Sequence, residues 1–525
     1  MGQPNWTGSD PPLPDGYRGS GLLLHITSLP SLYGIGDLGP GAYRWIDRMH
    51  EAGQSWWQAL PFGPTGYSHS PYQCLSSFVG NGLLISPDLL IEDGLLRAED
   101  CKGRFSSTRV DYEVVIPFKH RLLELAWANF QSGARNDLRP AFEEFCRTRA
   151  AWLDDYALFR ALKIHFNDVS YLQWPTELVE RYPSALAYAR RSLSDQIDQI
   201  RLAQFLLFRQ AARLKEYADA KGIRLIGDLP FFVSPDSSDV WANPQFFLLD
   251  QRRRQRFKAG VPPDYFSSQG QLWGNPVYDW NALGRTGYQW CIDRMRALLN
   301  HVSVIRLDHF RAFSAAWHVP ADSPTAQTGE WVAGPGESFF RAVRRELGTL
   351  PFIAEDLGTI TPDVEALRDE FSIPGTRVLQ FGFDGRFDNV HLPNNFVSNT
   401  VVYTGTHDNP TTREWFEGLT DYQQRAIWTY TKRHRGDARD VARELMRLAW
   451  SSRASLAIAP LQDLLNLGRE GRMNVPGTTE NNWRWSATQN MLAASDFEWL
   501  KQLTKSTNRL GRNDIPVIPL RKAAS

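Results

Sequence analysis

The segment that decides the fold is VIRLDHFRAF, which runs from Val304 to Phe313. Its first half is a short apolar run with a β-branched pair and no turn residue, which predicts a buried strand. Charged residues then follow, where a purely structural strand would stay apolar or turn. Arg306 and Asp308 are two positions apart, so on a strand both side chains point to the same face. The pair indicates either a structural ion pair or a catalytic carboxylate that a guanidinium keeps ionised.

Seven other short apolar segments resemble this one, and helical patterns separate most of them. Eight buried strands that alternate with helices predict an α/β fold, specifically a (β/α)8 TIM barrel. The eight strands are expected to begin near residues 22, 55, 224, 303, 352, 377, 400 and 455.

The connections after the second and third strands are too long for an ordinary loop. Residues 87–217 predict a mostly helical insert, because apolar residues recur there at three- and four-residue spacing. Residues 231–278 are rich in aromatic residues, proline and glycine, and a loop of that length usually has a function, such as a lid or a binding loop. The domain prediction is a flexible N-terminal extension over residues 1–18, followed by a catalytic barrel over residues 19–525 that these two inserts interrupt. Helices are expected within the first insert at residues 120–130, 140–149, 152–166 and 192–217.

The overall composition excludes several classes of partner. Lysine plus arginine and aspartate plus glutamate both number 58, so the net charge is zero. Binding to nucleic acid or to an acidic membrane surface would need a basic excess. The four cysteines have no CxxC spacing, and the N-terminus has no secretory pattern, so we expect a cytoplasmic protein without disulfides.

Polar residues gather at the C-terminal ends of the predicted strands. The carboxyl ends of all strands meet at one rim of a TIM barrel, and active sites lie there. Three of these strands, those that end at Asp308, Glu355 and Asp408, bring carboxylates to the rim together with histidine and arginine, which favours an active site over a chance arrangement. The residues at these ends are Asp228, Arg306, Asp308, Glu355, Asp356, His407 and Asp408.

Such a cluster suits glycoside chemistry, in which one carboxylate attacks the anomeric carbon and a second, protonated one donates to the leaving oxygen. Two neighbouring strand ends can hold the pair about 5 Å apart, as retaining catalysis requires. The alternative is a magnesium site of the enolase type. The sequence shows no lysine at a matching strand end, and its 19 tryptophans favour a sugar ligand.

At these residues the chain resembles the amylomaltases, the 4-α-glucanotransferases or disproportionating enzymes of glycoside hydrolase family 77. The resemblance extends from about Gly19 to Trp485 and is specific because many segments match together. The matching segments are Gly66–Gln73, Gly227–Pro230, Val261–Phe266, Gln271–Pro276, Arg306–Phe313, Ile353–Gly358, Thr404–Asn409 and Asn474–Gly477. One departure is Pro410, where many relatives have an acidic residue.

The resemblance implies a transfer reaction on 1,4-α-glucans, such as maltooligosaccharides, starch or glycogen, with neither a cofactor nor a metal ion. It implies that Asp308 is the nucleophile, Glu355 the general acid/base and Asp408 a third carboxylate that binds and distorts the sugar. The residues implied to contact the sugar are Arg306, His407, Asp228 and Tyr72, with Gln271 and Trp273 on a mobile acceptor loop and Asn474 and Ser70 as further contacts.

Several alternatives stay open at this point. An α-amylase-like retaining hydrolase would use the same carboxylates. A noncatalytic glucan-binding protein would keep the tryptophan platforms but lose the carboxylates. Individual residues also have structural interpretations: Asp228 could cap the turn before Pro230, and His407 could be a packed rim histidine.

Overall fold

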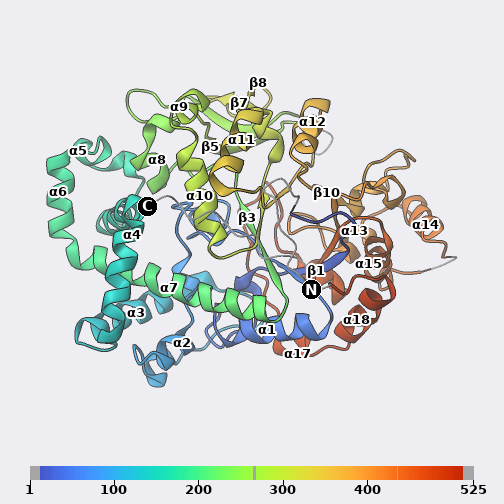
Figure 1. Cartoon of the computed structure of the whole chain (residues 1–525), viewed down its shortest axis with the longest axis horizontal. Coiled ribbons are helices and arrows are strands. Elements are labelled where there is room, and N and C mark those ends of the chain that lie inside the picture. Colours follow the sequence, from blue (N-terminus) through green and yellow to red (C-terminus); the bar gives the residue numbers. More distant parts are fainter. Residues whose placement is uncertain (1–11, 264–267, 434–435, 512–525) are drawn as a thin grey trace.

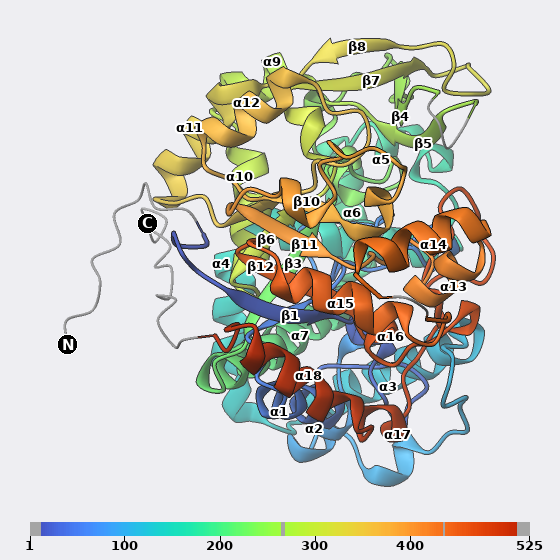
Figure 2. The ribbon, with the colours of Figure 1, turned by 90° about the vertical axis from the view of Figure 1, so that its right-hand side faces the viewer.

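The computed structural model describes residues 12–263, 268–433 and 436–511, and its centre is a closed barrel of eight parallel strands (Figures 1 and 2). The strands neighbour one another in the order β1-β12-β11-β10-β9-β6-β3-β2. All eight predicted strands are confirmed as barrel strands. Their bounds are β1 Gly19–Leu23, β2 Trp56–Gln58, β3 Arg224–Leu229, β6 Val304–Leu307, β9 Phe352–Ala354, β10 Gly375–Val378, β11 Thr400–Tyr403 and β12 Leu456–Pro460.

The register between β3 and β6 brings together polar residues that are far apart in the sequence. Asp228 pairs with Arg306 across this parallel ladder, and β6 is buried along its whole length. Helices cover the outside of the barrel, which explains why its strands are apolar on both faces.

The surrounding helices bury one apolar face each. In α1 (Pro40–Glu51) the buried residues Ala42, Trp45, Ile46 and Met49 recur at helical spacing. The remaining covering helices are α10 Gln289–Leu299, α11 Gly336–Leu347, α12 Pro362–Glu370, α15 Val441–Ser451 and α18 Asp496–Ser506.

The insert after β2 is helical and forms a lobe beside the barrel, on the left in Figure 1. Its helices are α2 Pro87–Glu92, α3 Tyr112–Gln131, α4 Arg139–His165, α5 Thr176–Val179, α6 Pro183–Ser192 and α7 Ser194–Ala220. The prediction of two helices over residues 140–149 and 152–166 is wrong, because α4 is continuous. The residues between them include neither glycine nor proline, so nothing in the sequence interrupts the helix.

A buried ion pair fastens this lobe to the barrel. The ammonium group of Lys119 on α3 lies 3.3 Å from the carboxylate of Asp37 and also donates to the carbonyl of Ile85. Both charged side chains are buried, and Asp37 belongs to the segment that follows β1.

The second insert forms part of an antiparallel sheet with the order β5-β4-β7-β8. Only β4 (Phe257–Val261) and β5 (Gln271–Pro276) come from residues 231–278. The other two, β7 (Ala315–Pro320) and β8 (Glu330–Ala333), come from the connection after β6. This third enlarged connection was not expected from the sequence. β7 pairs with the edge of β4, and β8 pairs with β7. This pairing satisfies backbone groups that an isolated β4–β5 hairpin would leave without partners.

The N-terminal segment differs from the expected flexible extension where the structure describes it. Leu13 is only 2% exposed and packs in the barrel interior with Leu23 and Trp56. The indole of Trp56 donates to the hydroxyl of Tyr17 at 2.7 Å. Residues 12–18 therefore close the end of the barrel where the strands begin. The rest of the predicted extension, residues 1–11, lies outside the described residues, as do residues 512–525 of the predicted barrel domain.

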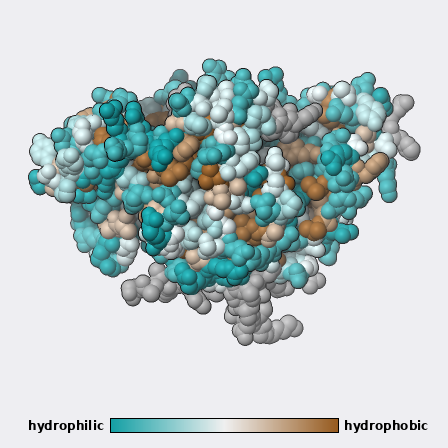
Figure 3. Space-filling model, turned by 90° about the horizontal axis from the view of Figure 1, so that it is seen from above, coloured by the Kyte–Doolittle hydropathy of each residue, from teal (hydrophilic) through white to brown (hydrophobic). Residues whose placement is uncertain are grey.

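The molecular surface alternates between polar and apolar areas. Figure 3 shows hydrophobic residues in several patches near the middle of one face, among larger hydrophilic areas. Among the described residues, no helix is both long and apolar enough to cross a membrane.

Candidate active site

Arg306 on β6 stands between two carboxylates. One of its terminal nitrogens lies 2.9 and 2.8 Å from the two oxygens of Asp228, and 2.9 Å from Asp308 Oδ1. The Arg306 side chain is 6% exposed and that of Asp228 is fully buried, whereas Asp308 keeps 28% of its side chain exposed. The guanidinium thus occupies the position between these carboxylates that a divalent cation would need, and it leaves Asp308 accessible.

Burial and the neighbouring charges shift the pKa values of these side chains in opposite directions. Burial alone would lower the pKa of Arg306, but Asp228 and Asp308 raise it well above its ordinary value. Burial raises the pKa of Asp308 to about 7, and the positive charge of Arg306 limits that rise.

Glu355 follows β9, the strand next to β6 in the barrel. Its Oε2 atom accepts a hydrogen bond of 2.8 Å from the backbone amide of His309, and its backbone amide donates to the carbonyl of Leu307 at 3.0 Å. Burial raises the pKa of Glu355 well above its ordinary value; Arg306 opposes this shift and Asp308 adds to it. Burial therefore favours the protonated form of Glu355, whereas the 2.9 Å contact with Arg306 favours the ionised form of Asp308.

Asp408 follows β11 and is held by two neighbours. The amide of Asn474 donates to its Oδ1 at 2.6 Å, and Nε2 of His407 lies 3.3 Å from its Oδ2. Nearly half of the Asp408 side chain is exposed, at 47%, so the carboxylate can still meet a ligand.

Tyr72 connects the Asp408 side of the site to Asp228. Its hydroxyl donates to Asp228 Oδ2 at 2.8 Å and lies 2.8 Å from His407 Nε2. The hydroxyl has one proton, and it donates that proton to the carboxylate, which can only accept. In the contact with His407 the hydroxyl must therefore accept, so we place the ring proton of His407 on Nε2. Burial lowers the pKa of His407 although Asp408 opposes the shift, which favours a neutral imidazole.

An aromatic wall lies beside this network. The rings of Tyr72 and His407 stack with centroids 5.4 Å apart, and Trp483 lies 5.9 and 6.0 Å from them. Ser70 shares the loop with Tyr72 and accepts a hydrogen bond from the Tyr72 backbone amide at 3.3 Å. Apolar ring faces next to polar groups suit the two kinds of surface on a sugar.

Gln271 and Trp273 lie on β5, two positions apart and on one face of the strand. The Trp273 indole donates to Gln271 Oε1 at 3.2 Å, and its ring meets the His309 ring edge-on with centroids 4.8 Å apart. The His309 backbone amide also donates to Glu355, so this residue connects β5 to Glu355. Part of the predicted segment Val261–Phe266, residues 264–266, lies outside the described residues.

The structure thus brings all the predicted site residues to one region. Seven form a continuous hydrogen-bonded and ionic network: Arg306, Asp228, Asp308, Tyr72, His407, Asp408 and Asn474. Glu355, Gln271 and Trp273 connect to this region through His309, and Ser70 through the Tyr72 loop.

The sequence analysis missed two residues of the site and included one strand-end residue that has a different role. His309 lies within the quoted segment, but nothing in its spacing showed that its backbone would bind Glu355. Trp483 had no local signal at all. Asp356 is buried beside Arg368 and Arg377 and accepts from the Thr376 amide at 2.6 Å, so it stabilises the barrel wall.

The structural interpretation of Asp228 as a turn cap does not match its contacts, because both carboxylate oxygens face Arg306. His407 is packed, as the alternative held, yet it also contacts Tyr72 and Asp408 through one nitrogen. Within the described ranges, no three histidine, cysteine, aspartate or glutamate side chains are grouped as a metal ion would require.

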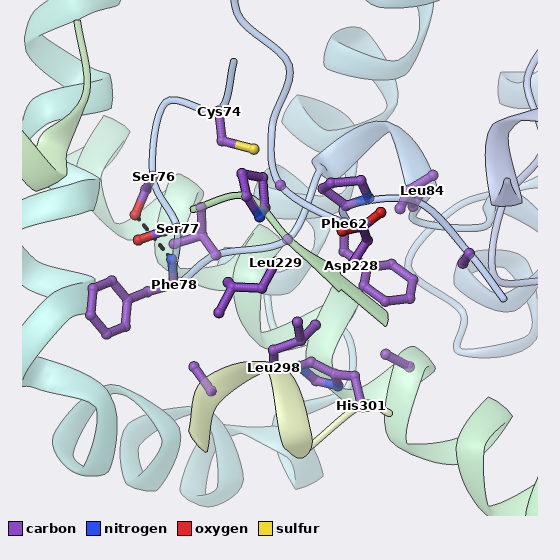
Figure 4. A pocket seen from close by; sticks show the side chains of 18 of the residues that line it. Phe62, Cys74, Ser76, Ser77, Phe78, Leu84, Asp228, Leu229, Leu298 and His301 are labelled. Carbon is purple, nitrogen blue, oxygen red and sulfur yellow. Dashed lines mark hydrogen bonds between the residues drawn. The ribbon is translucent and has the colours of Figure 1, made fainter. Parts of the chain in front are cut away.

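Asp228 also lines a mostly apolar cavity of about 80 Å³ (Figure 4). Phe62, Leu84, Leu229 and Leu298 are among its walls. A lower local dielectric strengthens a hydrogen bond that is already made, here the bond from Arg306.

Comparison with known proteins agrees with this geometry. Residues 24–491 match the glycoside hydrolase 77 family model, described as 4-α-glucanotransferase. The 4-α-glucanotransferase of Synechocystis sp. is 48% identical over 89% of this chain and 93% of its own length, and that of Thermus thermophilus is 44% identical over 94% and 99%. The solved amylomaltase of Streptococcus agalactiae in complex with acarbose superposes with a TM-score of 0.90, at 36% identity over 94% of this chain and all of that one. The chain therefore belongs to glycoside hydrolase family 77, the family of 4-α-glucanotransferases.

Proposed function

We propose that this 4-α-glucanotransferase moves a segment of a 1,4-α-glucan to the 4-hydroxyl of another glucan or of glucose by double displacement. The observation that supports this most strongly is the pair of carboxyl groups on neighbouring strands, Asp308 in contact with Arg306 at 2.9 Å and Glu355 held by the His309 amide at 2.8 Å. Retaining transfer requires one ionised and one protonated carboxyl group.

In the first step, an oxygen of the Asp308 carboxylate forms a bond to the anomeric carbon of the donor. The bond from that carbon to the glycosidic oxygen breaks, and Glu355 gives its proton to the departing oxygen. Arg306 favours the ionised nucleophile because it holds the carboxylate at 2.9 Å. The product is a β-linked glucosyl ester of Asp308, and the reducing-end fragment leaves.

In the second step, the ionised Glu355 takes the proton of the acceptor 4-hydroxyl. The acceptor oxygen bonds to the anomeric carbon, and the ester bond to Asp308 breaks. The α-configuration returns after two inversions. Transfer exceeds hydrolysis when the site admits the acceptor and limits water, a role we assign to the insert over residues 231–278 with Trp273.

The other predicted residues are proposed to hold the sugar. Asp408 and Asn474 would bind its hydroxyls, and Asp408 would also help to distort the ring. Tyr72 and His407 would offer a polar edge and an apolar ring face. Arg306 would hold the nucleophile and Asp228 would hold Arg306. Ser70 and Gln271 would make contacts further along the glucan.

The ligand class we propose is 1,4-α-glucan, as maltooligosaccharide, starch or glycogen, with neither a cofactor nor a metal ion needed. The structure of the relative from Streptococcus agalactiae contains acarbose, which supports a saccharide site. We also propose a cytoplasmic location, because the four cysteines remain free thiols.

Incubation with pure maltotriose tests the proposed function. Glucose together with maltopentaose and longer chains is expected, because each transfer lengthens one molecule and shortens another. The products would be separated by chain length over time, with the Asp308→Asn variant as the control for contaminating activity. Glucose and maltose alone would show an α-amylase-like hydrolase and refute the proposed water exclusion.

The pH dependence of kcat/KM for maltotriose is expected to be bell-shaped. Asp308 must be ionised to attack, and its raised pKa of about 7 means that activity falls as the pH drops through that region. Glu355 must be protonated, and burial raises its pKa well above its ordinary value, so activity is lost on the alkaline side only above the ordinary range of a glutamate. An acid limb near pH 4, the ordinary range of an exposed aspartate, would contradict the arrangement. Melting temperatures over the same range would separate titration from unfolding.

A further inference from the structure

His407 and Asp408 lie on a loop that we call the rim loop, residues 405–411, between β11 and α13 (Thr412–Glu417). The loop makes little backbone structure of its own. The Asn409 amide donates to the Thr406 carbonyl at 3.2 Å, and the Asn409 side chain accepts from the amide and hydroxyl of Thr406. These bonds shape the loop internally but do not fix it to the barrel.

One buried carboxylate holds both ends of the rim loop. Asp463 is 1% exposed and belongs to α16 (Leu461–Leu464), directly after β12. Its Oδ2 accepts from the hydroxyl of Thr404 at 2.5 Å and from that of Thr412 at 2.7 Å. Its Oδ1 accepts from the backbone amide of Thr412 at 2.7 Å. Thr404 precedes the loop and Thr412 follows it, so one side chain fixes the distance between the two ends.

A second contact limits the middle of the loop. Gln380 donates to the carbonyl of Pro410 at 3.1 Å. A side-chain carbon on Gly405 would lie 2.6 Å from the same Gln380 nitrogen, so the loop already packs closely there. Pro410 cannot donate a backbone hydrogen bond, which makes its carbonyl the atom available for anchoring.

The chemistry of Asp463 is unusual for a purely structural residue. Among the described residues no lysine, arginine or histidine forms an ion pair with it, so three hydrogen bonds alone offset the burial of its carboxyl group. Burial raises its pKa, and the Thr404 and Thr412 donors oppose the rise. An ionised acceptor makes shorter and stronger hydrogen bonds than a neutral one, so it orients its donors more firmly.

We propose that Asp463 is a positioning residue of the transfer reaction, which fixes the rim loop so that Asp408 meets the sugar in the reactive geometry. This inference rests on the sugar-binding and ring-distorting role proposed for Asp408. Asp463 touches neither the sugar nor the nucleophile, and it acts through the loop.

The Asp463→Ala variant removes all three bonds at once. We expect kcat with maltotriose to fall about 10²-fold, as a displacement of about 1 Å can cause, while KM changes much less. Thr404→Val and Thr412→Val each remove one hydroxyl and should cause smaller losses of kcat. Asp463→Asn keeps an acceptor for the Thr412 amide and should restore most of the activity.

A double-mutant comparison separates positioning from general damage. If Asp463 acts through Asp408, the Asp408→Ala/Asp463→Ala variant should be no slower than Asp408→Ala alone. If the two losses multiply, or if Asp463→Ala keeps wild-type kcat, the inference is wrong. Retained activity in Asp408→Ala would instead refute the role proposed for Asp408, which keeps the two failures distinct.

Folding is controlled with a matched buried aspartate. Asp37→Asn weakens a buried ion pair far along the chain from the rim loop, so it should lower the melting temperature and leave kcat unchanged. Where Asp463→Ala does not fold, Thr404→Val and Thr412→Val combined with Asp408→Ala answer the same question, since each retains the carboxylate. Multiplied losses in those pairs would equally overturn the inference.

Discussion

The Asp308→Asn variant is expected to fold normally and to lose turnover of maltotriose by about 10⁴-fold or more, the scale of loss when a covalent nucleophile is removed. The amide has nearly the same shape as the carboxylate but cannot form the glucosyl ester. Arg306 keeps two contacts of 2.8 and 2.9 Å with Asp228, so its charge remains paired. Turnover would be measured from product chain lengths, and folding from circular dichroism and the melting temperature.

Two controls make this result specific. The variant should still bind maltooligosaccharides, because the contacts assigned to Tyr72, His407 and Asn474 are unchanged. Retained turnover in a preparation free of wild-type enzyme would remove Asp308 from the role of nucleophile. A loss of both binding and melting temperature would indicate damage to the Arg306 cluster instead.

The Glu355→Ala variant is expected to lose about 10²–10⁴-fold in kcat on maltotriose, the usual contribution of a general acid/base. The glycosidic oxygen is a poor leaving group without a proton. An α-glucosyl fluoride needs no such proton, so the first step should remain fast with this donor. The second step should then be slow, because no base takes the proton of the acceptor. The glucosyl ester on Asp308 is expected to accumulate and to be visible by mass spectrometry of the intact protein.

Azide separates the roles of the two carboxyl groups. It attacks the ester without giving up a proton, so it should restore turnover of the fluoride in Glu355→Ala and yield the α-glucosyl azide. In Asp308→Ala, azide would instead take the place of the missing nucleophile and yield the β-azide. A β-azide from Glu355→Ala would reverse the two assignments. The backbone amide of His309, which binds Glu355 at 2.8 Å, is present in both variants and is not a variable in the comparison.

Much of the barrel could be predicted because the information is local. A strand such as Val304–Leu307 is apolar over consecutive residues since both of its faces are covered, and this pattern depends on no distant contact. The helical insert could be predicted because apolar residues at three- and four-residue spacing are also a local pattern. The insert over residues 231–278 was predicted but its antiparallel sheet was not, because β4 and β7 are short and their pairing across about sixty positions leaves no periodic signal. The break expected within α4 was wrong because apolar spacing weakened there without any helix-ending residue.

Only part of the site could be predicted from local patterns in the sequence. Asp228, Arg306 and Asp308 could be identified because each comes at the end of a buried strand, where a polar residue is costly without a purpose. Ser70, Gln271 and Asn474 rested on resemblance, since their segments are irregular and give no such contrast. Trp483 and Asp463 stayed unidentified, because a buried tryptophan or a single aspartate near a strand end is common in any large core.

The sequence by itself determined which segments are buried strands, in what order they follow, and which carboxylates stand at their ends. These properties depend on alternation and burial over a few residues, which the chain encodes locally. Only the tertiary structure decided which side chains touch. The hydroxyl of Tyr72 meets His407 across 335 positions because closure of the barrel makes the first and last strands neighbours. Asp463 joins Thr404 to Thr412 because β11 and β12 lie side by side in the barrel. Contacts of this kind depend on a register fixed by the whole ring of strands, so no single segment contains them.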